Sequence, residues 1–150
     1  MQLSWFEPGS IIRQDQDLIN TIVSSQYTQA VGYGDIDYFK NYINFVSTGP
    51  VDFCIYIVNK TFDFVQLIEH VNDVIKNQLN NNGLVYLSIN KYLAIPKLYD
   101  SSLADDYDCA IEQFVAKNVN AQIEQYHSCG NDGGTQFNWA HPLTRFYLRV

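Results

Sequence analysis

The stretch from Val51 to Val58 reads VDFCIYIV, a nearly continuous run of β-branched and aromatic residues. A strand covered by helices on both faces reads this way, whereas a half-exposed strand alternates apolar and polar residues. Apolar residues then recur at helical spacing over 63–81, and Leu84 to Ile89 (LVYLSI) forms a second apolar run after Asn80-Asn81-Asn82-Gly83. The sequence therefore predicts a central strand, a crossover helix and a parallel neighbouring strand.

The same pattern continues toward the C-terminus. Ser102 and Asp105 are spaced as in a helix cap, and they precede four residues at helical spacing: Ala110, Ile111, Phe114 and Val115. Strands are predicted near 121–127 and over 144–150 (TRFYLRV), on either side of a glycine-rich loop. We expect these two strands to pair antiparallel as a hairpin with a long loop.

The first fifty residues predict two helices. The first carries an apolar face formed by Leu18, Ile19, Ile22 and Val23. Asp35 is expected to cap the second, which ends at Gly49-Pro50 and whose apolar stripe is Ile36, Phe39, Tyr42, Ile43 and Val46.

These elements predict a single α/β domain over 1–150. Its N-terminal part, 1–50, is expected to be helical, and 51–150 to hold the strand-helix-strand units and the terminal hairpin. The predicted sheet is small and mostly parallel, with about four strands flanked by helices.

Composition narrows the classes of function. The chain has 150 residues, 16 acidic against 9 basic, and 47% hydrophobic residues. A net charge of -7 argues against direct binding to nucleic-acid backbones, which requires Lys and Arg. No apolar run is long enough for a membrane span, and the N-terminus lacks the pattern of a signal peptide. Three scattered cysteines do not suggest a disulfide framework, so we expect reduced thiols and a cytoplasmic protein without membrane contact.

The predicted order of elements over 51–150, including the strand NNNGLVYLSI, resembles the C-terminal half of a Rossmann-like, S-adenosylmethionine-dependent methyltransferase. In that family the cofactor binds at a glycine-rich loop after the first strand and at an acidic residue that ends the second. The glycine pair of this chain, in Val31-Gly32-Tyr33-Gly34-Asp35, follows the segment SSQYTQ (24–29), which reads as too polar for a buried strand. The resemblance therefore implies a shortened scaffold without the cofactor site, and no cofactor is expected.

Two Asn-Lys pairs follow the two predicted parallel strands: Asn59-Lys60 and Asn90-Lys91. Ligands of open α/β sheets bind at the carboxyl ends of the strands, so the pairs are candidates for an anionic or amide-rich ligand. Alternatively, they are ordinary polar residues at the point where each strand leaves the core. His70 is interpreted as lying on the solvated face of its helix.

The segment 127–141 concentrates groups that can carry chemistry. His127, Cys129, Asp132 and His141 are the candidates, either as a Cys/His nucleophile pair with the aspartate or as a His/Cys metal set. The paired cysteine spacing of a structural zinc site is absent, so no metal is expected and no catalytic assignment is firm. The alternative is a hairpin loop whose histidines are packed or hydrogen-bonded.

Five acidic residues lie within thirteen positions: Asp100, Asp105, Asp106, Asp108 and Glu112. They either stabilise the start of a helix or form a surface that docks on a basic protein partner. A complex of the second kind would weaken with salt and with charge reversal at Asp105, Asp106 and Asp108.

The leading prediction is a small, acidic protein that acts by protein-protein binding, with a virus-encoded regulator of a host factor, in the host cytoplasm, as its most specific form. An enzymatic role, as a reduced methyltransferase or a Cys/His enzyme that uses the strand ends and the 127–141 loop, is the less favoured alternative. The third is a structural domain that self-associates, and the sequence leaves the oligomeric state open.

Overall fold

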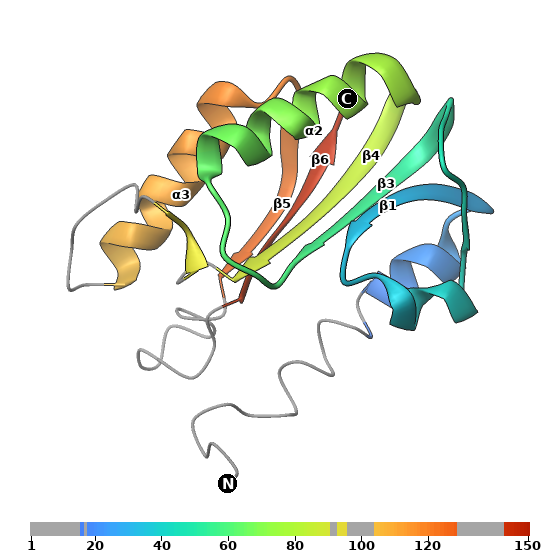
Figure 1. The fold of residues 1–150 in the computed structure, drawn as a ribbon, viewed down its shortest axis with the longest axis horizontal. Helices are drawn as coiled ribbons and strands as arrows, with labels where there is room; N and C mark the ends of the chain where they lie inside the picture. Colours follow the sequence, from blue (N-terminus) through green and yellow to red (C-terminus); the bar gives the residue numbers. More distant parts are fainter. Residues whose placement is uncertain (1–15, 17, 91–92, 96–103, 129–142) are drawn as a thin grey trace, which may run out of the picture.

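The computed structural model describes residues 16, 18–90, 93–95, 104–128 and 143–150. They form a six-stranded mixed sheet in the order β2-β1-β3-β4-β6-β5 (Figure 1). The strands are β1 (Gln29–Gly34), β2 (Asn44–Phe45), β3 (Val51–Val58), β4 (Leu79–Asn90), β5 (Gln122–Ser128) and β6 (Leu143–Arg149). The named helices are the 3-10 helix η1 (Asp37–Asn41), α2 (Phe64–Gln78) and α3 (Ala104–Asn118), and residues 18–24 are also helical.

The predicted strand-helix-strand unit is confirmed. β3 occupies the stretch predicted for the central strand and pairs in parallel with β4, with Val58 opposite Ile89. Between them, α2 starts after Asp63, whose carboxylate accepts a hydrogen bond from the Gln66 amide at 3.1 Å. This side chain satisfies one of the donors that a helix N-terminus leaves unpaired.

The predicted terminal hairpin is confirmed in its pairing. β5 and β6 are antiparallel, with Tyr126 opposite Phe146. β6 also pairs antiparallel with β4, so it lies inside the sheet and β5 forms one edge.

The prediction of about four strands was wrong, as was that of a wholly helical N-terminal part. β1 lies within the first fifty residues and pairs in parallel with β3, with Val31 opposite Cys54. Its fully buried part is limited to Ala30 and Val31, and its first and last residues are exposed. A strand this short and polar at its ends owes its place to β3 rather than to its own pattern.

The helix predicted from Asp35 to Gly49-Pro50 was also wrong. This segment forms η1 and then β2, which pairs in parallel with β1. Phe39 and Ile43 are both buried, and a 3-10 turn followed by an extended segment places both against the core. Phe39 and Ile43, four positions apart, therefore both reach the core although the segment does not form a long helix.

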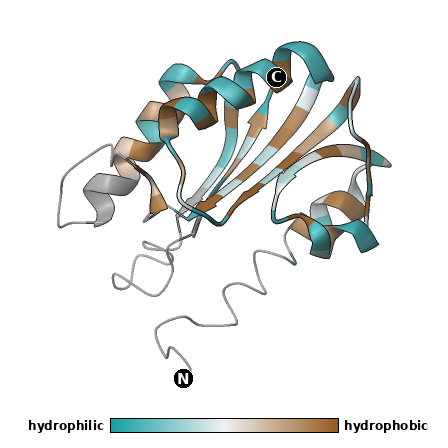
Figure 2. Ribbon diagram, in the orientation of Figure 1, coloured by the Kyte–Doolittle hydropathy of each residue, from teal (hydrophilic) through white to brown (hydrophobic). Residues whose placement is uncertain are grey.

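Helices cover both faces of the sheet. α2 and α3 lie together on one face, and the helical residues 18–24 and η1 lie on the other (Figure 1). The strands between them are coloured mainly as hydrophobic (Figure 2). Each face has its own cluster of buried side chains, the larger one beneath α2 and α3 and the smaller one including Leu18, Phe39, Phe53 and Tyr86.

Amide side chains connect separate elements. Asn72 of α2 donates to the backbone oxygen of Asn118 at 2.9 Å and accepts from the amide of Asn120 at 2.7 Å. These two bonds hold the C-terminal end of α3 against α2. The amide of Asn72 therefore stabilises the packing of the two helices.

Arg149, the last residue of β6, connects three segments. Its guanidinium binds both carboxylate oxygens of Glu124 at 3.0 and 3.1 Å. It also donates to the Tyr27 hydroxyl at 3.1 Å and to the backbone oxygen of Asn82 at 3.0 Å. The bonds with Arg149 hold the pKa of Glu124 below its usual range.

Candidate functional site

The connections of the sheet diverge between β1 and β3. From β1 the chain passes through η1 to β2 on one side, and from β3 it passes through α2 to β4 on the other. β1 and β3 are parallel neighbours, so their carboxyl ends lie together at this point. In open α/β sheets this reversal leaves a crevice outside the carboxyl ends of the strands, where ligands bind.

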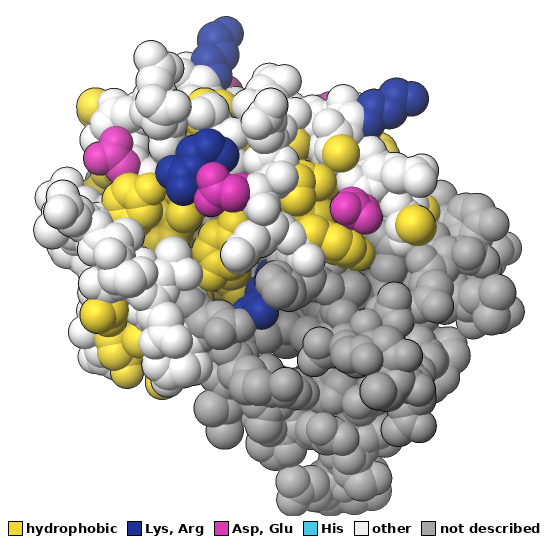
Figure 3. Space-filling view, turned by 180° about the vertical axis from the view of Figure 1, so that it is seen from behind, with side chains coloured by type: hydrophobic (Ala, Val, Ile, Leu, Met, Phe, Trp, Pro, Cys, Tyr) yellow, Lys and Arg dark blue, Asp and Glu magenta, His cyan; other side chains and the backbone are white. Residues whose placement is uncertain are grey.

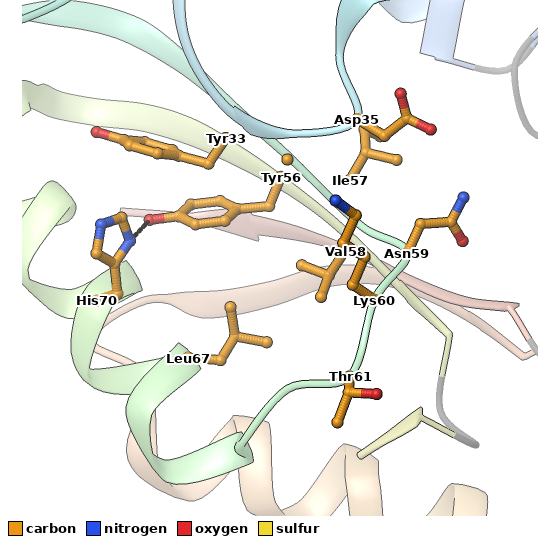
Figure 4. A pocket seen from close by; sticks show the side chains of 11 residues that line it. Tyr33, Asp35, Tyr56, Ile57, Val58, Asn59, Lys60, Thr61, Leu67 and His70 are labelled. Atoms are coloured by element: carbon orange, nitrogen blue, oxygen red, sulfur yellow. Dashed lines mark hydrogen bonds between the residues drawn. The ribbon is translucent and has the colours of Figure 1, made fainter. Parts of the chain in front are cut away.

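A cavity of about 720 Å³ lies at these strand ends. It is lined by the end of β1, by the end of β3 with the residues that follow it, and by α2 (Figure 4). Its polar groups are exposed and carry opposite charges, with Asp35 after β1 and Asn59, Lys60 and Thr61 after β3. The volume falls within the range of roughly 300–1,000 Å³ that is typical of small-molecule sites.

The aromatic side of the cavity is a connected cluster. The rings of Tyr33 and Tyr56 are stacked, with centroids 4.9 Å apart, and His70 of α2 meets Tyr33 edge-on at 4.7 Å. The Tyr56 hydroxyl and His70 Nδ1 are 2.6 Å apart, and Gln78 donates to the Tyr33 hydroxyl at 3.2 Å. Burial raises the pKa of both tyrosines above its usual value, so both hydroxyls remain protonated at neutral pH.

Gly32 and Gly34, at the end of β1, allow neighbouring protein atoms to pack closely against the strand. Gly34 has a φ of 86°, and a Cβ there would overlap the carbonyl oxygen of Ile57. A Cβ on Gly32 would lie 2.5 Å from Ile36 Cδ1 and 2.6 Å from the ring of Phe45. Protein atoms therefore fill the space that the missing side chains leave, and neither glycine forms an open cradle for a ligand.

The strand-end prediction places two of its four residues on this cavity. Asn59 and Lys60 line it. Val58 is opposite Ile89, so Asn59 and Asn90 directly follow a paired position, but Asn90 is not among the lining residues. Lys91 lies outside the described residues.

The predicted 127–141 site is not tested. Cys129, Asp132 and His141 lie outside the described residues, as does the side chain of His127, whose backbone belongs to β5. Within the part of the chain that the structure describes, no group of three or more His, Cys, Asp or Glu residues could hold a metal ion.

The predicted acidic surface also stays a prediction. Asp100 lies outside the described residues, as do the side chains of Asp105, Asp106 and Asp108, while Glu112 is half-buried on α3. On the face seen in Figure 3, the acidic side chains of the described residues do not gather into one patch, and one of them lies beside a basic side chain. None of the helices in the described ranges is long and apolar enough to cross a membrane.

Tyr33, Tyr56 and His70 were not predicted as site residues. His70 is exposed, as its position on the polar side of the helix indicated, but it also contacts both tyrosines. The sequence carries only an indirect signal of this cluster, because Tyr56 is a hydroxyl-bearing residue within the apolar run from Phe53 to Val58. A buried hydroxyl requires a partner, and in this fold the partner lies on the following helix.

Comparison with known proteins gives a similarity of fold. No protein-family model matches the chain, and no curated protein matches it in sequence. A solved structure assigned as a SAM-dependent methyltransferase from Streptococcus mutans aligns with 91% of this chain at 10% identity and a TM-score of 0.48, and the chain spans 48% of that protein. A 30S ribosomal methyltransferase from an uncultured bacterium aligns with 89% of this chain at 14% identity, with a TM-score of 0.47 and 92% of its own length covered. At these identities the similarity is one of fold and does not extend to individual residues.

Proposed function

We propose that the cavity between the carboxyl ends of β1 and β3 binds a small organic molecule. The observation that carries this proposal is the coincidence of the cavity with the point where the connections of the sheet diverge. The ends of two strands and one helix line this position, so groups from three segments can contact one ligand.

The lining favours a ligand with two unlike ends. Leu67 and Val58 supply apolar surface, and Tyr33 supplies an aromatic ring. Asp35 and Lys60 add one negative and one positive group at the strand ends. A ligand with an aromatic or aliphatic body and a charged or strongly polar head matches this distribution.

S-adenosylmethionine is the first compound to test, because the topology resembles that of enzymes that use it. The glycine pair does not supply a ligand cradle, since its open space is filled by Ile57, Ile36 and Phe45. The residues left to hold such a ligand are Asp35 and the polar residues after β3. Small aromatic compounds need no such cradle and match the aromatic side of the cavity, so they are tested beside it.

The experiment is a titration of the ¹⁵N-labelled chain with S-adenosylmethionine and with a set of small aromatic fragments, followed by amide NMR. We expect at least one compound to shift the amides of Asn59, Lys60 and Thr61. Replacing Lys60 by glutamine should weaken binding of an anionic compound by roughly threefold or more. The matched control is Lys76→Gln, which removes the same charge from an exposed position of α2 outside the cavity lining.

Two results would overturn the proposal. One is that no compound shifts the amides at the strand ends. The other is that the shifts gather on other elements and respond equally to the two lysine substitutions.

A further inference from the structure

Burying the hydroxyl of Tyr56 costs free energy unless the hydroxyl makes a hydrogen bond. Tyr56 is 2% exposed, and a phenylalanine would give the same apolar contacts without a polar atom to satisfy. The hydroxyl reaches His70 Nδ1 at 2.6 Å, a short hydrogen bond between a strand and a helix. A buried hydroxyl that bonds one specific partner also orients that partner.

Either the Tyr56 hydroxyl or His70 Nδ1 supplies the hydrogen of this bond, depending on the tautomer of the ring. If Nδ1 carried the proton, it would donate to Tyr56, and the hydroxyl hydrogen of Tyr56 would then need a second acceptor. Among the described residues the hydroxyl of Tyr56 has no second hydrogen-bond partner. The consistent arrangement has the hydroxyl donating to an unprotonated Nδ1. A neutral imidazole in this arrangement carries its proton on Nε2.

We propose that His70 presents a fixed Nε2–H donor to the ligand of this cavity and selects ligands that carry an anionic oxygen, a carboxylate or a phosphate. The inference rests on the proposed function, because it concerns the ligand of the same cavity. The imidazole lines the cavity, and Nε2 is the ring nitrogen that Tyr56 leaves available. The amide of Asn59 and the ammonium of Lys60 add further donors to the same lining.

Tyr56 is a positioning residue in this arrangement and His70 a specificity-determining one. Two carboxylates lie near this ligand site: Asp35 lines the cavity, and Asp73, one turn after His70 on α2, acts electrostatically on both tyrosines. The negative charge of these two carboxylates disfavours an anionic ligand. Selection of an anion therefore depends on the donors of the lining, His70, Asn59 and Lys60. Removal of the His70 donor should therefore reduce the preference for an anion as well as the affinity.

The first experiment reads the tautomer by itself. The ¹⁵N chemical shifts of the neutral His70 ring should show a proton on Nε2 and none on Nδ1. In Tyr56→Phe the two tautomers should mix, and the two ring shifts should move toward each other. A wild-type ring protonated on Nδ1 would overturn the proposal whatever the cavity binds.

The second experiment measures selection with phenylacetate, phenyl phosphate and the neutral 2-phenylethanol. We expect at least one anion to bind about tenfold more tightly than the alcohol, as a hydrogen bond between charged and neutral partners allows. His70→Phe should abolish that preference, and His70→Gln, which restores an N–H donor, should recover part of it. Circular dichroism of each variant verifies that the fold is retained.

The outcomes separate the two proposals. Equal binding of all three probes, or a preference that survives His70→Phe, overturns the donor role and leaves the cavity as a binding site. Failure of all three probes to shift the amides at the strand ends overturns the cavity and the donor role together. Phosphate and carboxylate are distinguished by which of the two anionic probes binds more tightly.

Discussion

Replacing Gly34 by alanine tests how closely the end of β1 is held against β3. The φ of 86° at Gly34 costs an alanine about 1–2 kcal/mol. The added Cβ would overlap the carbonyl oxygen of Ile57, and because both groups belong to backbone, the two strands must separate. Separation breaks the 2.9 Å hydrogen bond from the Asp35 amide to that oxygen, worth about 1 kcal/mol. We expect Gly34→Ala to lower the free energy of unfolding by about 3 kcal/mol.

Gly32→Ala is the matched control in the same strand. Its Cβ would meet the side chains of Ile36 and Phe45, which can turn aside, rather than backbone. We expect a loss of about 1–2 kcal/mol, typical of moderate overpacking. Urea denaturation followed by circular dichroism gives both values. If Gly34→Ala is as stable as Gly32→Ala, the reasoning from the backbone contact is refuted.

Three further predictions concern the contacts between elements. Asn72→Ala, which removes two hydrogen bonds to the end of α3, should lower the free energy of unfolding by about 1–2 kcal/mol in thermal or urea denaturation, whereas Asn77→Ala should change it by less than about 0.5 kcal/mol. Because Arg149 lowers the pKa of Glu124 below its ordinary 4.5, the stability that this pair adds is present above that pH and is lost as the pH falls through the lower, folded value. Wild type should therefore lose its advantage over Glu124→Gln in acid, and an advantage that is constant with pH would contradict the pair. Cys54 is buried and its thiol pKa is raised by burial, so mass spectrometry after iodoacetamide treatment should find it unmodified in the native chain, while the exposed thiol of α3 reacts.

The elements that could be predicted from the sequence are those with a long apolar run or a long, regular spacing of apolar residues. The run of β3 is apolar apart from the exposed Asp52, and α2 buries Phe64, Ile68 and Val71 at regular spacing. Such segments carry enough local information to define their own element type. β1 does not, because Ala30 and Val31 are its only fully buried residues and its pairing depends on Cys54 and Ile55, more than twenty positions along the chain.

The residues of the candidate site likewise fall into a group that local sequence predicts and a group that it does not. Asn59 and Lys60 were predicted because the position of a polar pair after a buried parallel strand is a local feature of the sequence. The bond between Tyr56 and His70 joins a strand to a helix, and the face of α2 that meets β3 is decided by the packing of the whole helix. The tyrosine in the apolar run indicates that a partner is needed, but a separation of fourteen positions does not identify the histidine as that partner.

The position of β6 has a consequence for the order in which the protein assembles. β6 is the last of the six strands to be synthesised, yet it lies between β4 and β5 and pairs with both. Until β6 emerges from the ribosome, β5 has no partner strand and α3 cannot be held over a completed sheet. The nascent chain must therefore keep β4 and β5 apart, or separate them again, and a delay at this stage would expose two strand edges to other chains.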